Sequence, residues 1–239
     1  MKKIMLPLLI VFTLNTIVSQ VLTGAQLLEK AIAYHDPENQ WYSFRGTLAI
    51  TMNTPNSSDR FSAVMFNLPA NYFKLTVKKD SITYEQELNK GICVQKLNGS
   101  SSISPADAKK YRLSCERALT MKNYYTYLYG LPMKLKDHGT ILSQKVLKKS
   151  FKGKDYLVLK VTYEESVGKD VWYFYFDPET YALKVYQFFH DEAANDGEYI
   201  LLEGEMTIQN MKIPQKRSWY TNKENRYLGT DLLTAFSPL

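Results

Sequence analysis

The sequence lacks the short motifs that mark the common enzyme classes. It contains no HExxH zinc motif, no P-loop, no GxSxG nucleophile elbow and no GxGxxG dinucleotide fingerprint. Each of these motifs supplies a group on which its chemistry depends, so their absence argues against the enzymes that use them. The sequence therefore favours a protein that is not an enzyme, with no catalytic residue, no metal site and no cofactor.

Histidine is scarce, with only His35, His138 and His190 in the chain. Each lies next to an aspartate, but neighbours in a strand point to opposite faces, so adjacency alone makes no catalytic pair. All three lie near predicted turns, which favours turn or surface roles. A hydrolase that uses one of these histidines is kept as an alternative. Separately, Glu85/Glu87 and Glu203/Glu205 share strand faces at a spacing that could mimic a hydrolase pair, and solvated outer faces give the same pattern.

Cysteine is also scarce. Only Cys93 and Cys115 occur, without a CxxC pair, which argues against a redox role. In an exported protein an even number of cysteines suggests a disulfide, which here would join the end of a strand to a helix. The chain-entropy model gives such a loop roughly 3 kcal/mol of stabilisation. The alternative is two buried thiols that act as small apolar residues.

Charge of one sign is not concentrated in any segment. The formal net charge of +6 includes Lys2 and Lys3, and the other basic residues are spread out in pairs such as Lys148-Lys149 and Lys216-Arg217. Nucleic-acid-binding proteins more often gather them on one element. We therefore expect no nucleic-acid partner and at most a peripheral contact with a membrane. The basic pairs are expected to lie at solvated strand edges and turns.

The one long apolar run lies at the N-terminus. Met1 to Lys3 is cationic, residues 4–18 are almost wholly apolar, and the small residue Ser19 follows. This order is typical of a secretory signal peptide and is too short for a stable membrane span. We predict a signal peptide at residues 1–19 and export of residues 20–239, to the periplasm of a Gram-negative cell or otherwise outside the cell. No cysteine follows Ser19, which favours a released protein over a lipid-anchored one.

Alternating hydrophobicity dominates the rest of the chain. A period of two predicts about five strands between residues 44 and 97 and about six between residues 142 and 220. Short turns separate these strands, which is typical of an antiparallel meander. Residues 230–236 fit either a strand or a helix.

Two segments predict helices. A capping box at Thr23 begins a helix over residues 24–34. Ser104 and Pro105 supply an N-cap and a first-turn proline for a helical region that continues to about Tyr129, where Gly130-Leu131-Pro132 ends it.

No Gly/Ser linker or change of composition divides residues 20–239, so we predict a single domain. Two helical segments cannot cover both faces of about eleven strands, and a sheet of that size must curl or be covered. We therefore predict an α+β fold in which a large curved antiparallel sheet, an unclosed half-barrel, packs helices on its concave face.

Aromatic residues are concentrated in two segments, residues 124–129 and 171–176. An aromatic strand face opposite a tyrosine-rich helix could line an apolar cavity. The alternative is a filled core in which the helix packs on the sheet and nothing else enters. The candidate lining residues are Trp172, Phe174, Phe176, Tyr125 and Leu128.

Several stretches resemble an uncharacterised family of exported proteins with a LolA/LolB-like, lipoprotein-carrier-like fold. They are Tyr34-His35-Asp36-Pro37, Cys115-Glu116-Arg117, residues 127–137, residues 173–178 and Leu228-Gly229-Thr230-Asp231. The resemblance implies an unclosed curved sheet capped by helices over a hydrophobic cavity for acyl chains.

The leading hypothesis is a soluble exported binding or carrier protein. Its partner would be a hydrophobic or acylated ligand held between the sheet and the helices. One alternative is an envelope interaction or structural module with a filled core and an envelope protein partner, and the other is the histidine-dependent hydrolase.

Overall fold

The computed structural model describes residues 22–239, so the predicted signal peptide lies outside the described residues. Within residues 22–239 the helices are α1 (Gly24–His35), η1 (Trp41–Ser43), α2 (Pro105–Lys110), α3 (Cys115–Gly130) and η2 (Met133–Lys136). The strands of the first half are β1 (Arg45–Asn53), β2 (Arg60–Asn67), β3 (Tyr72–Lys79), β4 (Ile82–Asn89) and β5 (Ile92–Leu97). Those of the second half are β6 (Thr140–Phe151), β7 (Lys154–Tyr163), β8 (Val171–Phe176), β9 (Leu183–Phe189), β10 (Glu198–Ile208), β11 (Met211–Thr221) and β12 (Tyr227–Pro238).

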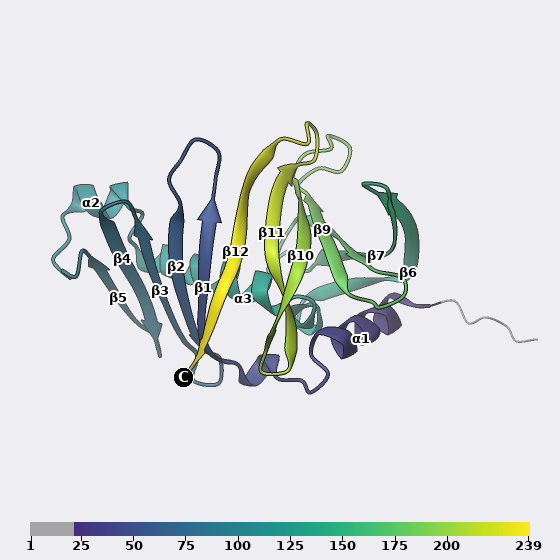
Figure 1. Ribbon diagram of the computed structural model, residues 1–239, viewed down its shortest axis with the longest axis horizontal. Coiled ribbons are helices and arrows are strands. Elements are labelled where there is room, and N and C mark those ends of the chain that lie inside the picture. The colour runs from purple at the N-terminus through teal and green to yellow at the C-terminus, as the bar shows by residue number, and fades with distance from the viewer. Residues whose placement is uncertain (1–21) are drawn as a thin grey trace, which may run out of the picture.

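All these strands form one twelve-stranded antiparallel sheet (Figure 1), in the order β5-β4-β3-β2-β1-β12-β11-β10-β9-β8-β7-β6. The pairing of β1 with β12 joins the two meanders, and β5 and β6 are the two free edges. The sheet is therefore unclosed, as predicted. The alternation predicted about eleven strands, and the twelfth is β12, the segment that fitted either a strand or a helix.

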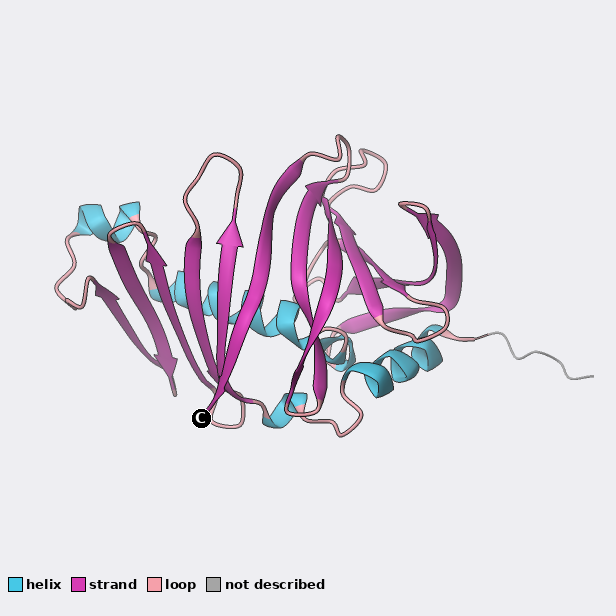
Figure 2. Cartoon of the chain, viewed as in Figure 1, coloured by secondary structure: helices cyan, strands magenta, loops and turns pink. Residues whose placement is uncertain are grey.

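Helix α3 lies along the concave face of the sheet and passes behind its central strands in Figure 2. Its residues Tyr125, Leu128 and Tyr129 belong to the main apolar core, together with inward-facing residues of both meanders. The predicted α+β architecture, with helices on the concave face of a curved sheet, is confirmed. No helix within residues 22–239 is long and apolar enough to cross a membrane.

The predicted central helix over residues 104–129 is in fact two helices, α2 and α3. Between them Arg112 adopts a left-handed backbone conformation, with a φ of 55°. Ser114 then begins α3, because its side chain accepts a hydrogen bond from the backbone N–H of Arg117. The second N-cap interrupts what the sequence suggested as one continuous segment.

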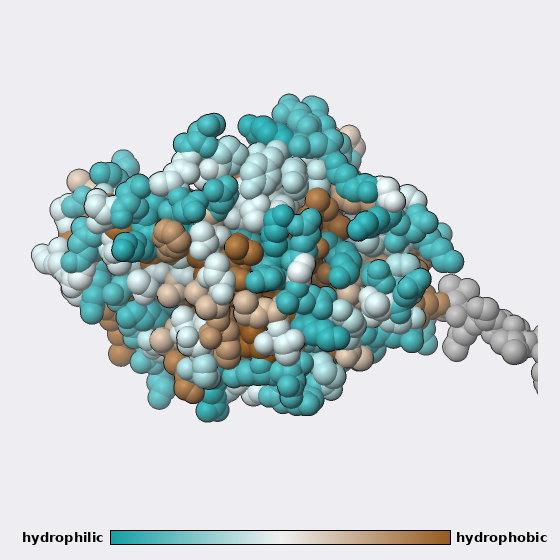
Figure 3. Space-filling view, in the orientation of Figure 1, coloured by the Kyte–Doolittle hydropathy of each residue, from teal (hydrophilic) through white to brown (hydrophobic). Residues whose placement is uncertain are grey.

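A smaller apolar cluster lies on the other face of the sheet, where the β6–β7 hairpin folds over β8 to β10. The ring of Phe151 lies 5.2 Å from those of both Tyr175 and Tyr199. This cluster buries Val158, Tyr173 and Tyr175. Figure 3 views the molecule from the side opposite α3 and shows a mostly hydrophilic surface with smaller apolar patches.

The expectation of a turn or surface role is wrong for His35, which is fully buried at the end of α1. Its Nδ1–H donates to the Lys212 carbonyl oxygen at 2.6 Å, and its Nε2 accepts from the Leu183 backbone N–H at 2.9 Å. Burial lowers the pKa of His35 to about 4, so the ring is neutral near pH 7. His35 therefore joins α1 to β11 and to the first residue of β9.

Candidate functional site

Charged side chains form a row across the middle of the sheet, beneath α3. The antiparallel register aligns Arg60 of β2 with Met52 of β1, Met52 with Asp231 of β12, and Asp231 with Arg217 of β11. Residues directly opposite each other share a sheet face. Arg217 and Asp231 are each only 1% exposed, and Arg60 is half-buried. We call Arg60, Asp231 and Arg217 the charged row.

Tyr129 of α3 and Tyr186 of β9 lie next to this row. The Arg217 guanidinium lies 3.9 Å from the centre of the Tyr129 ring, and its two terminal nitrogens donate to the carbonyl oxygens of Pro214 at 2.8 Å and Leu128 at 3.4 Å. Burial raises the pKa of Asp231, and the two arginines of the row act in the opposite direction.

Many polar atoms at this interface have no hydrogen-bond partner. Buried polar groups in proteins are nearly always hydrogen-bonded, so such a concentration calls for an explanation, such as a bound molecule or a second conformation. The unpartnered groups are Nε of Arg60 and Arg217, Oγ of Ser62, the hydroxyls of Tyr125, Tyr129 and Tyr186, Nε1 of Trp219 and Oδ1 of Asp231.

A small, partly open cavity of about 60 Å³ lies beside Arg60, between β2–β4 and the first half of α3. Arginine and tyrosine side chains supply its polar lining, and we call it the arginine cavity. Its walls are Arg60, Leu75, Val77, Tyr84, Gln86, Tyr111, Arg112, Arg117, Met121 and Tyr125.

A larger, open cavity of about 400 Å³ lies beside the second half of α3, and we call it the Trp172 cavity. The Trp172 ring packs against Tyr127 at 5.5 Å and against Phe188 at 4.8 Å, between ring centres. The walls combine the aromatic rings of Trp172, Tyr127 and Tyr163 with polar groups. They are Asn123, Thr126, Tyr127, Lys134, Asp137, His138, Thr140, Tyr163, Val167, Gly168, Asp170 and Trp172.

The five predicted lining residues lie at the same interface but do not surround one cavity. Trp172 lines the Trp172 cavity and Tyr125 lines the arginine cavity. Phe174, Phe176 and Leu128 line neither, because they pack in the main core with at most 4% exposure. Their role in binding stays a prediction.

In the part of the chain that the structure describes, no histidine is hydrogen-bonded to a side chain that could act as a nucleophile. His138 is exposed and lines the Trp172 cavity, while Nδ1 of His190 lies 2.7 Å from Oδ1 of Asp170, which raises the pKa of His190. No hydrogen bond in residues 22–239 joins a histidine to a serine, threonine or cysteine side chain. The same residues contain no group of three or more metal-ligating side chains.

Sequence reasoning missed the charged row. The charge pattern predicted that both Lys216 and Arg217 are solvated. This prediction holds for Lys216, whose Nζ lies 2.6 Å from a carboxylate oxygen of Glu203, and it is wrong for the buried Arg217. The alternation of Ile213, Arg217 and Trp219 was an available signal, because it places the arginine on the apolar face of its strand.

Cys93 and Cys115 form the disulfide that the sequence suggested, with a Cα–Cα distance of 5.8 Å. The bond fastens β5 to the first residue of α3. It holds the α2–α3 turn, which carries Arg112, against the edge of the sheet.

Comparison with known proteins supports this architecture. A family model described as "Family of unknown function (DUF6503)" matches residues 2–235. The comparison with curated proteins finds no match.

Among solved structures, a LolA superfamily protein from Nitrosomonas europaea is 12% identical, with a TM-score of 0.51 over 92% of this chain and 94% of that one. A putative outer membrane lipoprotein-sorting protein domain from Vibrio parahaemolyticus is 12% identical, with a TM-score of 0.53 over 90% and 92%. A DUF1329 family protein from Desulfovibrio piger is 8% identical, with a TM-score of 0.51 over 90% and 93%. At these identities the likeness shows a LolA-like fold and nothing about activity.

Proposed function

We propose that this chain, which belongs to the DUF6503 family of unknown function, is an exported carrier for a lipid-like or acylated ligand. The observation that supports the proposal is the Trp172 cavity, which lies beside α3 at the concave face of an unclosed sheet. Two of the structures that share the fold have titles that refer to the LolA superfamily and to outer membrane lipoprotein sorting. This analogy supports the proposal at the level of the fold.

The apolar part of the ligand packs against Trp172. The cavity volume of about 400 Å³ falls within the range of about 300–1,000 Å³ that is typical of small-molecule sites. Tyr127 and Tyr163 extend its aromatic wall. Each buried CH₂ of an alkyl chain would contribute about 0.8 kcal/mol. The walls also include the polar side chains of Lys134 and His138.

The other predicted lining residues belong to a deeper part of the same path. Tyr125 already lines the arginine cavity, whereas Phe174, Phe176 and Leu128 contact the ligand only when α3 moves away from the sheet. Such a movement breaks no hydrogen bond of the Tyr125 and Tyr129 hydroxyls, and it separates Leu128 and Tyr129 from the Arg217 guanidinium.

Export follows from the predicted signal peptide at residues 1–19, with residues 20–239 as one domain. The disulfide between Cys93 and Cys115 supports an oxidising compartment, such as the periplasm or the outside of the cell. In such a compartment an apolar cargo needs a protein to carry it through water, and an envelope protein is the expected donor or acceptor.

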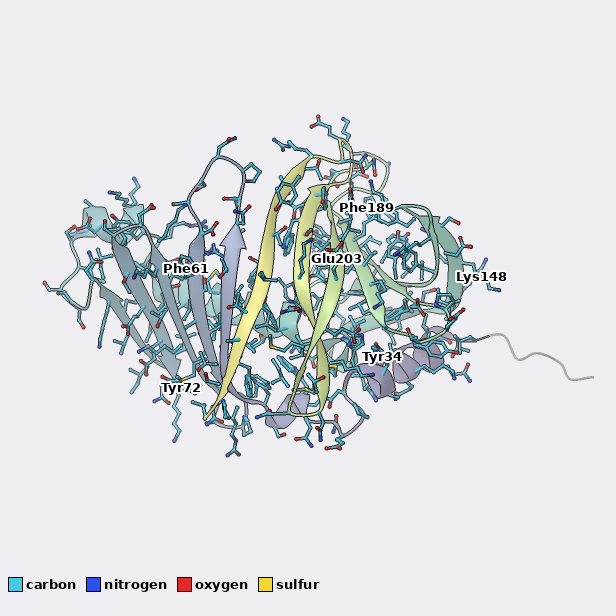
Figure 4. The ribbon with its side chains drawn as sticks, in the orientation of Figure 1. Tyr34, Phe61, Tyr72, Lys148, Phe189 and Glu203 are labelled. Carbon is cyan, nitrogen blue, oxygen red and sulfur yellow. A yellow bond between two sulfur atoms is a disulfide. The ribbon has the colours of Figure 1, made fainter. Side chains whose placement is uncertain are left out.

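The test is a titration of delipidated residues 20–239 with a fluorescent fatty acid. We expect saturable binding that Trp172→Ala weakens about tenfold or more, because a large apolar contact is lost. Phe61→Ala is the matched control, since Phe61 is 53% exposed on the opposite face of β2 and should not affect binding (Figure 4). Binding that never saturates, or that is the same in the wild type and Trp172→Ala, contradicts the proposal.

A second candidate is an envelope interaction or structural module. The tight packing of Phe174, Phe176 and Leu128 favours it, because these residues leave no space in the centre of the core. Native mass spectrometry of protein purified from its own host distinguishes the two functions. A carrier retains an apolar small molecule, whereas the module has the mass of the polypeptide alone.

A further inference from the structure

Three arginines from three separate elements converge on the arginine cavity. Arg60 comes from β2, Arg112 from the α2–α3 turn and Arg117 from α3. None of the ion pairs in residues 22–239 includes an arginine. These guanidinium groups therefore have no carboxylate partner in direct contact.

The three positive charges lie close to one another; Arg60 and Arg117 are half-buried, and Arg112 is exposed. All three arginines act on Tyr84, where they oppose the rise in pKa that burial causes. Burial lowers the pKa of Arg117, and Arg112 and Arg60 lower it further. Like charges near each other in a partly buried site cost free energy, which an anion placed among them would offset.

The remaining walls add hydrogen-bond donors and no carboxylate. Tyr125 is 1% exposed, and its hydroxyl has no partner. Ser62 lies close to that hydroxyl, but the two make no hydrogen bond of normal geometry. Two acidic side chains stand outside the cavity: Asp231 belongs to the charged row and helps to raise the pKa of Arg60, and Glu116 lines the adjoining surface pocket.

The size of the cavity limits what it can hold. A single water needs about 10–15 Å³ of such volume, so about 60 Å³ accommodates a group of a few heavy atoms. The neighbouring surface pocket has a volume of about 430 Å³ and shares Arg112 and Arg117 with the cavity. The shared walls place the cavity next to the surface pocket, which is the side from which an anion would enter.

We propose that Arg60, Arg112 and Arg117 bind an oxyanion, a phosphate or carboxylate group, in the arginine cavity. Arginine forks match the oxygens of both groups, and the Tyr125 hydroxyl adds a further donor. If the oxyanion is the head group of the carried amphiphile, this part of the inference rests on the proposed function. Free phosphate would occupy the same site without any carrier role.

The test compares four probes on residues 20–239 by isothermal titration: inorganic phosphate, acetate, a fatty acid and the fatty alcohol of the same length. We expect saturable binding of inorganic phosphate, and fatty acid binding about tenfold or more tighter than that of the alcohol. Arg112→Gln and Arg117→Gln should each weaken phosphate and fatty acid about tenfold, and leave the alcohol unchanged. Arg226→Gln, at an exposed position away from the cavity, should change none of them.

The outcomes separate this inference from the proposed function. Phosphate binding that the arginine variants abolish, with no binding of either amphiphile, supports the oxyanion site and rejects the carrier. Equal binding of acid and alcohol, unchanged in the variants, supports the carrier and overturns the oxyanion site. Near-ultraviolet circular dichroism confirms that each variant is folded. Arg117→Lys, which keeps the charge, should restore part of the lost binding.

Discussion

Arg217 and Asp231 stand directly opposite each other on β11 and β12, and both are almost completely buried. Asp231 also lies in register, across Met52, with Arg60 on β2. One carboxylate is thus placed between two guanidinium groups at the centre of the sheet. Its removal would leave two arginines without the negative charge that compensates them.

Asp231→Asn therefore should destabilise the protein by about 3 kcal/mol, since the amide has nearly the same shape but no charge, and uncompensated buried charges are costly. Urea unfolding at pH 7, followed by tryptophan fluorescence, measures the change in the free energy of unfolding.

Glu203→Gln is the matched control, because Glu203 of β10 forms a largely exposed ion pair with Lys216 of β11 (Figure 4). An exposed ion pair contributes less than about 1 kcal/mol. If Asp231→Asn costs no more than Glu203→Gln, the charged row is electrostatically unimportant.

His35 should make stability depend on pH. The unfolded chain takes up a proton near pH 6.5, whereas the buried ring has a pKa of about 4. The stabilisation is therefore complete above pH 6.5 and is lost as pH falls toward 4, because the unfolded state then binds more protons. The shift corresponds to about 3 kcal/mol. Urea unfolding at intervals from pH 7.5 to 4 measures the loss.

His35→Gln should remove this part of the pH dependence, although it lowers stability at neutral pH. His190→Gln should retain the loss at acidic pH. The pKa of His190 is raised by Asp170, so its contribution is present below pH 6.5 and lost as pH rises. A wild-type and a His35→Gln curve with the same slope between pH 6.5 and 4 would show that His35 is not the titrating group.

The course of the sheet could be predicted from the sequence because each strand alternates locally. In the first meander, inward-facing apolar residues such as Leu48 and Ile50 alternate with polar ones, and the inward-facing residues are buried. The pairing of β1 with β12 could not be predicted, since it joins residues nearly two hundred positions apart and depends on how the two meanders meet.

The site was less predictable for the same reason. Arg60, Asp231 and Arg217 become neighbours only through the register of the four strands β2, β1, β12 and β11. Of these, β1 and β12 pair although they are the first and the last strand of the described chain. The sequence contexts of Arg60 and Asp231 resemble those of solvated residues, whereas Arg217 shares a strand face with apolar residues such as Ile213 and Trp219. By contrast, Trp172 could be identified as a candidate because aromatic residues are concentrated locally around it.

The disulfide should stabilise the first half of α3 and the oxyanion site together. Cys93 and Cys115 are separated by 22 residues, and a loop of that length corresponds to about 3 kcal/mol in the chain-entropy model. The double variant Cys93→Ser/Cys115→Ser should lose about that amount, measured by urea unfolding. It should also bind phosphate more weakly, because Arg112 and Arg117 flank the freed end of α3. Unchanged phosphate affinity in a folded double variant would separate the disulfide from the site.

Gly24 should tolerate no side chain, although it opens a helix. A Cβ at this position would collide with the backbone carbonyl of Ser143 on β6 and with the Leu159 side chain. Ser143 lies where the register of β6 with β7 shifts, between Leu142 and Val146, and Lys145 in this stretch pairs with Thr23. Either α1 or this stretch of β6 would therefore have to shift. Overpacking of this kind costs about 1–3 kcal/mol, more than the gain in helix propensity of at most about 1 kcal/mol. Gly24→Ala should therefore lower the free energy of unfolding by about 1–2 kcal/mol in urea.

Gly168→Ala tests whether that loss comes from the collision rather than from replacing any glycine. A Cβ at Gly168 would meet only Tyr163, at 3.7 Å or more, which is ordinary van der Waals contact. Its effect should stay within about 0.5 kcal/mol, as for most surface substitutions. Equal losses in the two variants would mean that the close approach of α1 to β6 does not limit packing. A larger loss in Gly24→Ala would show that the absence of a side chain at Gly24 lets α1 reach the sheet.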